Sequence, residues 1–85
     1  MIIKIKSKQE CLEAGKECLK KDGYSENDIK LFSEDFILNF LPEELFGTEH
    51  SCCNYEDDDS GRVYYVGQEQ WAVADFFVEE VTTVS

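Results

Sequence analysis

The sequence is poor in positive charge and has few of the residues on which enzymes and metal sites depend. It contains one His, and from residue 31 to residue 85 a single cation, Arg62, stands among 13 Asp and Glu residues. The whole chain has a net charge of −11. Nucleic acids and anionic membranes are polyanions that repel such a protein at long range, so we expect it to bind neither directly. We expect a basic partner instead.

Long apolar runs are also missing. None approaches the roughly 20 residues that a membrane span requires, and the first residues, Met1–Lys6, lack the apolar core and cleavage site of a secretory signal. Adjacent cysteines such as Cys52 and Cys53 rarely bridge each other, and nothing indicates an oxidising compartment. The sequence therefore predicts a cytoplasmic protein with four reduced thiols.

Motifs of catalysis and metal binding are absent. The segment 56–61 resembles the start of an EF-hand loop, but Gly67 stands where the twelfth position requires a bidentate Glu. His50, Cys52 and Cys53 do not have the spacing of a zinc site, and His50 lies too close in sequence to Cys52 to indicate a catalytic dyad. We therefore expect no catalytic residues, no metal site and no cofactor, and predict that the protein is not an enzyme.

The N-terminal part has clear signals of a strand and a helix. With 42% hydrophobic and 13% aromatic residues, the 85-residue chain has the composition of one folded domain. Residues 2–6 alternate between apolar and Lys, the pattern of a half-buried strand. Ser7 and Glu10 form a capping box that predicts a helix over 8–22, and Gly23 suits its C-terminal cap.

A second helical segment is predicted over 25–41. Ser25 begins it, and Phe32, Phe36 and Phe40 recur at helical spacing. Ser33 can restart the helix, so one bent helix or two short ones are both possible. Pro42 favours a new turn, which Gly47 closes.

The C-terminal part is harder to interpret. Residues 48–61 are polar and predict a loop, whereas 62–66 form the clearest strand in the chain. Residues 68–80 suit a helix better than the alternative, a hairpin connection over 66–71 with strand beyond it, and 81–84 could add a short strand. The predicted fold class is α+β, a small β-sheet packed against two or three helices in a single domain. The core contacts that we expect come from Phe32, Phe36, Phe40, Trp71 and Phe77.

The acidic residues are the best candidates for function. Ordinary surfaces intersperse both signs of charge, whereas this chain concentrates carboxylates, most sharply at 56–59. If 68–80 is a helix, its acids form a row on the surface. The residues that we expect to bind a partner are Glu43, Glu44, Glu56, Asp57, Asp58, Asp59, Glu69, Asp75, Glu79 and Glu80.

In size, acidity and lack of catalytic chemistry, the chain resembles the small phage-encoded DNA-mimic inhibitors, namely anti-restriction proteins and some anti-CRISPR proteins. The resemblance is one of overall character and includes no motif, so it assigns no residue roles. It implies a stoichiometric inhibitor whose acidic face occupies the basic groove of a DNA- or RNA-binding protein, such as a host defence nuclease. It also implies a possible homodimer.

Two alternatives follow from the same sequence. An immunity or antitoxin protein would block one basic toxin, with aromatic residues such as Tyr55, Tyr64 or Tyr65 contributing much of the affinity. A protein-interaction module whose acidity is incidental would bind equally well after its charges are neutralised.

Overall fold

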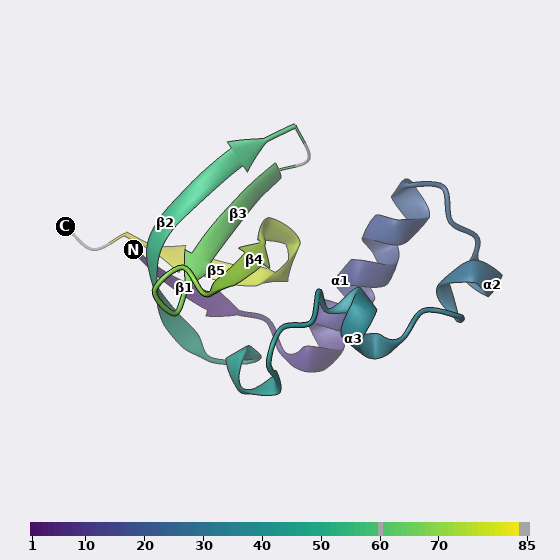
Figure 1. Ribbon diagram of the computed structural model, residues 1–85, viewed down its shortest axis with the longest axis horizontal. Helices are drawn as coiled ribbons and strands as arrows, with labels where there is room; N and C mark the ends of the chain where they lie inside the picture. The colour runs from purple at the N-terminus through teal and green to yellow at the C-terminus, as the bar shows by residue number, and fades with distance from the viewer. Residues whose placement is uncertain (60, 84–85) are drawn as a thin grey trace.

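The computed structural model describes residues 1–59 and 61–83, which form one α+β domain. Its antiparallel sheet has the strand order β4-β3-β2-β1-β5, and helical segments pack against the sheet at one end (Figure 1). The predicted fold class is confirmed. None of the helices in the described ranges is long and apolar enough to cross a membrane.

The sheet bends around its longest strand, β2 (Glu49–Asp58). The first residues of β2 pair with β1 (Ile2–Ile5), whose other side pairs with β5 (Val78–Thr82). The rest of β2 pairs with β3 (Gly61–Val66), and β3 pairs in turn with β4 (Trp71–Ala74). The strands predicted over 2–6 and 62–66 are thus confirmed, but β2 lies between them.

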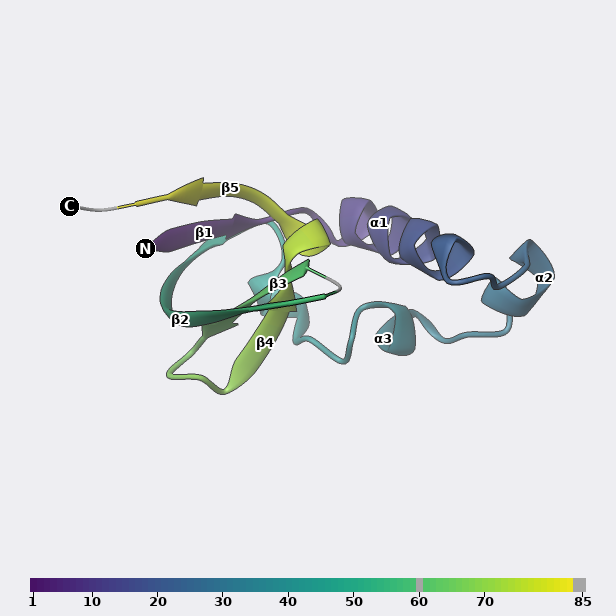
Figure 2. The same ribbon diagram turned by 90° about the horizontal axis from the view of Figure 1, so that it is seen from above.

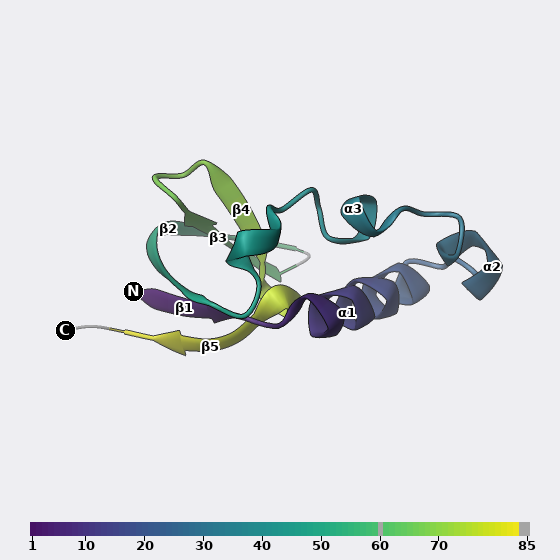
Figure 3. The same ribbon diagram turned by 90° about the horizontal axis from the view of Figure 1, so that it is seen from below.

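The helices form an arm that extends away from the sheet, so that the domain measures 45 × 28 × 20 Å (Figures 2 and 3). The arm consists of α1 (Lys8–Lys21) and two single-turn helices, α2 (Glu26–Ile29) and α3 (Glu34–Ile37). The segment 25–41 is therefore two short helices rather than one bent helix.

Serine residues cap all three helices of the arm. The Ser7 hydroxyl accepts a hydrogen bond from the backbone N–H of Glu10 and donates one to the Glu10 carboxylate. Ser25 and Ser33 each accept from the backbone N–H three residues later. Gly23 follows α1 with a φ of +102°, a conformation that glycine adopts without strain. These caps confirm the predicted starts.

The core lies between the sheet and the arm. Its fully buried side chains include Ile3, Ile5, Val66, Val73 and Phe77. The predicted turn at Pro42 is confirmed as the 3₁₀ helix η1 (Glu43–Leu45), which buries Leu45. A second 3₁₀ helix, η2 (Asp75–Phe77), connects β4 to β5 and brings Phe77 into the core.

The predicted core contacts are only partly correct. Phe77 is fully buried, and Phe32 and Trp71 are partly buried against the core. Phe36 and Phe40, however, are 47% and 68% exposed. Residues at i, i+4 and i+8 share one face only within a continuous helix, whereas α3 ends at Ile37 and Phe40 lies beyond it with a left-handed φ of +59°.

Two predicted elements are wrong. Residues 49–58 form β2 rather than a loop, because backbone pairing with β1 and β3 overrides their polar composition. Residues 68–80 are not a helix: a turn at Gly67–Gln70 begins the hairpin to β4, and β5 follows η2. The hairpin alternative is confirmed, since Val73 pairs with Tyr64 and is fully buried. Val84, in the possible strand at 81–84, lies outside the described residues, whereas Val81 and Thr82 belong to β5.

Candidate partner-binding surface

The acidic run at 56–59 is divided between the two faces of the β2–β3 hairpin. Asp57 pairs directly with Arg62, Glu56 with Val63, and Asp58 with Gly61. Successive residues of a strand point to opposite faces of the sheet. Asp57 therefore shares one face with Arg62, while Glu56 and Asp58 lie on the other.

On the first face, Arg62 is engaged within the hairpin. Its Nε donates to Asp57 Oδ1 at 2.7 Å and its Nη2 donates to Asp57 Oδ2 at 3.3 Å. The guanidinium also lies over the Tyr55 ring, 4.2 Å from its centroid. The hydrogen bonds that Arg62 donates to Asp57, followed by its hydrogen bond to Tyr64, raise the pKa of Arg62 above its ordinary value. The charges of Asp57 and Arg62 thus cancel locally, and this face is not strongly acidic.

On the second face, carboxylates gather around Tyr65. The Tyr65 hydroxyl donates to Glu56 Oε2 at 3.2 Å. This hydrogen bond, partial burial, and the negative charges of Glu56, Glu69 and Asp58 together raise the pKa of Tyr65. Glu69 comes from the β3–β4 turn, where it has a left-handed φ of +68°. We call Glu56, Asp58, Tyr65 and Glu69 the Tyr65 cluster.

The other predicted residues lie on separate elements. Glu44 and Glu43 belong to η1, and Glu43 pairs with Lys8 at 3.4 Å. Glu79 and Glu80 belong to β5, where Glu79 pairs with Lys4 at 3.5 Å. The remaining two are Asp59, which directly follows β2, and Asp75 in η2.

The proposed helical row of acids at 68–80 is wrong, because Glu69, Asp75, Glu79 and Glu80 occupy a turn, a 3₁₀ helix and a strand. Of the ten predicted residues, Glu56 and Asp58 share the face of the hairpin on which Tyr65 lies, and the negative charge of Glu69 in the adjoining turn also acts on Tyr65. Tyr65 itself was identified only as a possible hot-spot aromatic in the toxin-binding alternative. The sequence did contain a signal for its role. Strand alternation along 62–66 places Tyr65 on the opposite face from Tyr64 and Val66, but only the pairing of β3 with β2 shows that Glu56 and Asp58 share the face of Tyr65.

The Tyr65 cluster does not have the geometry of a metal site. Within residues 1–59 and 61–83, no three His, Cys, Asp or Glu side chains are placed to hold a metal ion. The Glu56 carboxylate accepts a hydrogen bond from the Tyr65 hydroxyl instead. The arrangement can present negative charge next to an aromatic ring, which suits recognition of a cation.

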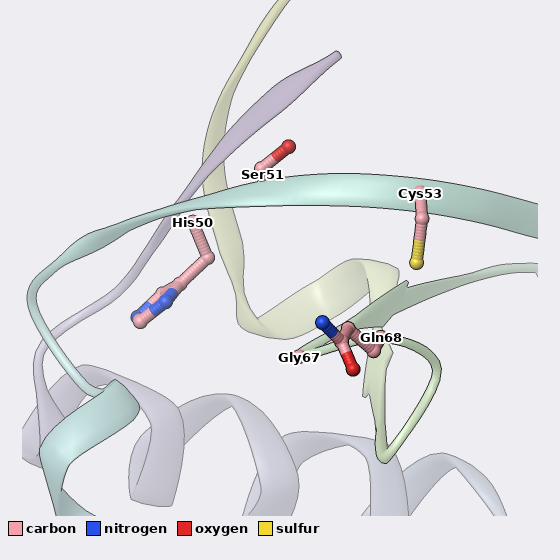
Figure 4. A pocket seen from close by; sticks show the side chains of 5 residues that line it. All are labelled: His50, Ser51, Cys53, Gly67 and Gln68. Carbon is pink, nitrogen blue, oxygen red and sulfur yellow. The ribbon is translucent and has the colours of Figure 1, made fainter.

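A hollow at the start of β2 does not form a catalytic site. His50, Ser51, Cys53, Gly67 and Gln68 line it, and His50 and Cys53 lie well apart in it (Figure 4). His50 Nε2 is hydrogen-bonded to the Thr48 hydroxyl at 2.6 Å, and the Cys53 thiol donates to the backbone oxygen of Tyr65 at 3.5 Å. The two side chains therefore do not form a nucleophile–base pair.

Comparison with known proteins found no match: no protein-family model, no curated protein and no solved structure is similar to this chain. Function must therefore be argued from the arrangement of the residues themselves.

Proposed function

We propose that this protein is a stoichiometric inhibitor that binds a basic DNA- or RNA-binding protein through the Tyr65 cluster and excludes the nucleic acid from it. The single observation that supports this most is that Glu56 and Asp58 lie on the same face of the exposed β2–β3 hairpin as Tyr65, whose hydroxyl donates to Glu56, with Glu69 in the adjoining turn. The nearest cation in the same hairpin, Arg62, is bound to Asp57 on the opposite face.

The spacing of the charges supports a nucleic-acid mimic. Residues two apart on a strand are separated by about 7 Å, so Glu56 and Asp58 present two regularly spaced charges along β2. Proteins that bind DNA neutralise a regular array of phosphates with Lys and Arg. A basic groove of this kind can therefore accept the hairpin in place of a nucleic-acid strand, while the Tyr65 ring adds apolar contact.

Not all of the acidic residues contribute equally to this proposal. Glu43 and Glu79 pair with Lys8 and Lys4, so their charge is partly compensated. Asp57 is compensated by Arg62. The inhibitory surface is centred on the face of the hairpin opposite Arg62, where the Tyr65 cluster lies with Asp59 next to it, rather than spread evenly over the ten predicted residues.

The test begins with affinity capture of the partner in about 50 mM NaCl, elution with a salt step and identification by mass. Binding of the purified partner is then measured over a range of salt concentrations and in competition with duplex DNA. We expect binding to weaken steeply with salt, because each ion pair formed releases counterions. We also expect duplex DNA to displace the protein.

Matched variants locate the surface. The triple variant Glu56→Gln, Asp58→Asn, Glu69→Gln removes three charges from the Tyr65 cluster, and we expect each substitution to weaken binding by a further step. The control Glu13→Gln, Asp28→Asn, Asp35→Asn removes three exposed charges from the helical arm and should bind almost normally. A salt-independent affinity, or a ternary complex with DNA, would refute the proposal.

A second candidate is a plug for the active site of one basic enzyme, as in an immunity or antitoxin protein. The contact between Tyr65 and Glu56 favours it, because a partly buried aromatic beside a charge is typical of a binding hot spot. Tyr64, in contrast, is only 3% exposed and cannot contact a partner. Tyr65→Phe and Tyr65→Ala separate the candidates: a plug predicts collapse of binding from one substitution, whereas mimicry predicts graded loss.

A further inference from the structure

Two aromatic side chains that the core does not bury line a hollow between the arm and η2. Phe36 of α3 is 47% exposed and Phe76 of η2 is 36% exposed. Both border a hollow of about 200 Å³, together with Cys18, Leu19 and Asp22 from the end of α1. The elements α3 and η2 both pack on α1 (Figure 3), so the hollow is formed by three separate parts of the chain.

The aromatic walls of the hollow are held in place. Phe36 stacks on Phe32 with ring centroids 4.8 Å apart, and Phe76 packs edge-on against the buried Phe77 at 4.6 Å. The backbone oxygen of Phe76 also accepts a hydrogen bond from Lys6 Nζ at 3.0 Å. The two rings are therefore part of a preformed surface.

Among the described residues that line the hollow, Asp22 is the one charged side chain. Asp22 is the C-terminal cap of α1, where the helix dipole also favours a cation. An adjoining hollow of about 680 Å³ shares Cys18, Asp22 and Phe76, and its lining includes Glu17 and Asp75. The cations on the same lining are Lys21 and Arg62, and Arg62 is neutralised by Asp57. Apolar walls thus meet one carboxylate, Asp22, and the adjoining hollow adds Glu17 and Asp75 beside Lys21 and Arg62.

We propose that this hollow binds a single Lys or Arg side chain of the basic partner, an inference that rests on the proposed function. The apolar stem of such a side chain packs on Leu19 and Phe36, and its cation lies against the aromatic faces and Asp22. The size agrees, because drug-sized ligands occupy about 300–1,000 Å³, and the hollow is smaller than that. It therefore suits one side chain better than a free small molecule.

Other occupants fit the hollow less well. A purely apolar side chain would cover Asp22 without offering it a hydrogen bond, and burying an unpaired carboxylate is costly. A second copy of the chain carries the same net charge of −11, so long-range repulsion opposes its approach. A cationic side chain provides apolar contact with the aromatic walls and an opposite charge for Asp22.

The experiment uses the full chain and an acetylated, amidated peptide of three Arg-Gly repeats, followed by NMR of the backbone amides. We expect the largest shift changes at Cys18, Asp22, Ile37 and Phe76. The variants Asp22→Asn and Phe76→Leu should each weaken binding by about fivefold, the loss of roughly 1 kcal/mol for one cation contact. Their matched controls, Asp28→Asn and Phe40→Leu, alter exposed residues outside the hollow and should bind normally.

Four outcomes would overturn the inference. In the first, the shifts are confined to the Tyr65 cluster. In the second, a peptide with norleucine in place of arginine binds equally well, so the cation is irrelevant. In the third, the chain self-associates without peptide and Phe76→Leu abolishes this association. In the fourth, neither Asp22→Asn nor Phe76→Leu weakens binding. Amide spectra of each variant establish that it is folded.

Binding of the captured partner distinguishes this inference from the proposed function. If the triple variant of the Tyr65 cluster weakens partner binding and Asp22→Asn does not, the hollow is irrelevant and the proposed function stands. If Asp22→Asn weakens binding of the arginine peptide while partner binding is independent of salt, the proposed function fails and the hollow remains a site for a cationic side chain.

Discussion

At the scale of single residues, Cys11 shows how burial determines the chemistry of a side chain. It is fully buried at the start of α1, and its thiol donates to the backbone oxygens of Lys6 and Phe77 at 3.5 and 3.9 Å. In the core, Cys11 acts as a small apolar side chain. Its contacts connect β1, α1 and η2, so ionisation of this thiol should affect the whole fold.

Alkaline pH should destabilise the protein through Cys11. Burial raises the pKa of this thiol from 9.0 to about 11, so the folded state retains the proton that the unfolded chain loses first. The stabilisation is fully present below pH 9 and disappears as the pH rises to 11, a loss of roughly 2 kcal/mol in the free energy of unfolding. Urea unfolding between pH 8 and 11 measures it.

The control for this prediction is a second cysteine. Cys11→Ala should be less stable at pH 8 but lose less stability up to pH 11, whereas Cys53→Ala, at an exposed position, should follow the wild-type curve. Parallel curves for all three proteins would mean that Cys11 does not determine the alkaline loss.

At the scale of elements, the sequence predicts what local chemistry decides. The serine caps of the arm and the left-handed Gly23 act through backbone groups a few residues away, so they can be recognised without a structure. The strands β2, β4 and β5 depend on partners elsewhere in the chain. A polar strand such as β2, exposed along most of its length, lacks the apolar alternation that would reveal it.

The candidate site, like the fold, was predictable from the sequence only in part. The acidic run and its importance follow from the sequence, and the run contains two members of the Tyr65 cluster. That Asp57 lies on the opposite face from Glu56 and Asp58 follows only from the strand pairing. Glu69 joins the cluster because a turn folds it back beside Tyr65, which the predicted helix at 68–80 excludes.

Gly15 of α1 allows α3 to approach α1 closely. A Cβ atom at this position would lie 2.6 Å from Ile37 Cγ2 and 3.0 Å from the Ile37 backbone oxygen. Gly to Ala inside a helix ordinarily stabilises by about 0.5–1 kcal/mol. Here the clash should outweigh that gain, and we expect Gly15→Ala to lower the free energy of unfolding by about 1–2 kcal/mol, measured by urea unfolding.

The double variant Gly15→Ala, Ile37→Ala tests the cause of that loss. Removing the Ile37 side chain relieves its part of the clash. The double variant should therefore lose less free energy of unfolding than the sum of the losses in the two single variants. Additive effects, or a Gly15→Ala protein more stable than wild type, would show that the close approach of the two helices does not matter.

At the scale of the whole molecule, charge is unevenly distributed over an elongated body. Lys8 pairs with both Glu34 and Glu43, at 3.8 and 3.4 Å, and so connects α1 with α3 and η1. Lys20 pairs with Glu26 at 3.3 Å within the arm. Exposed pairs of this kind contribute about 0–1 kcal/mol each. With 19 acidic residues against 8 basic ones, we expect repulsion among the acids to outweigh these attractions.

Added salt should therefore stabilise the protein. At 0.1 M ionic strength the Debye length is about 10 Å, so salt screens repulsion between distant carboxylates more than attraction between ions in contact. We expect the free energy of unfolding to rise by about 1 kcal/mol between 20 and 300 mM NaCl, equivalent to roughly 4–8 °C in Tm. The triple variant of the Tyr65 cluster should gain less, because it has three fewer charges to screen. If stability instead falls with salt, the surface ion pairs outweigh the repulsion, and the acidic surface costs the fold little.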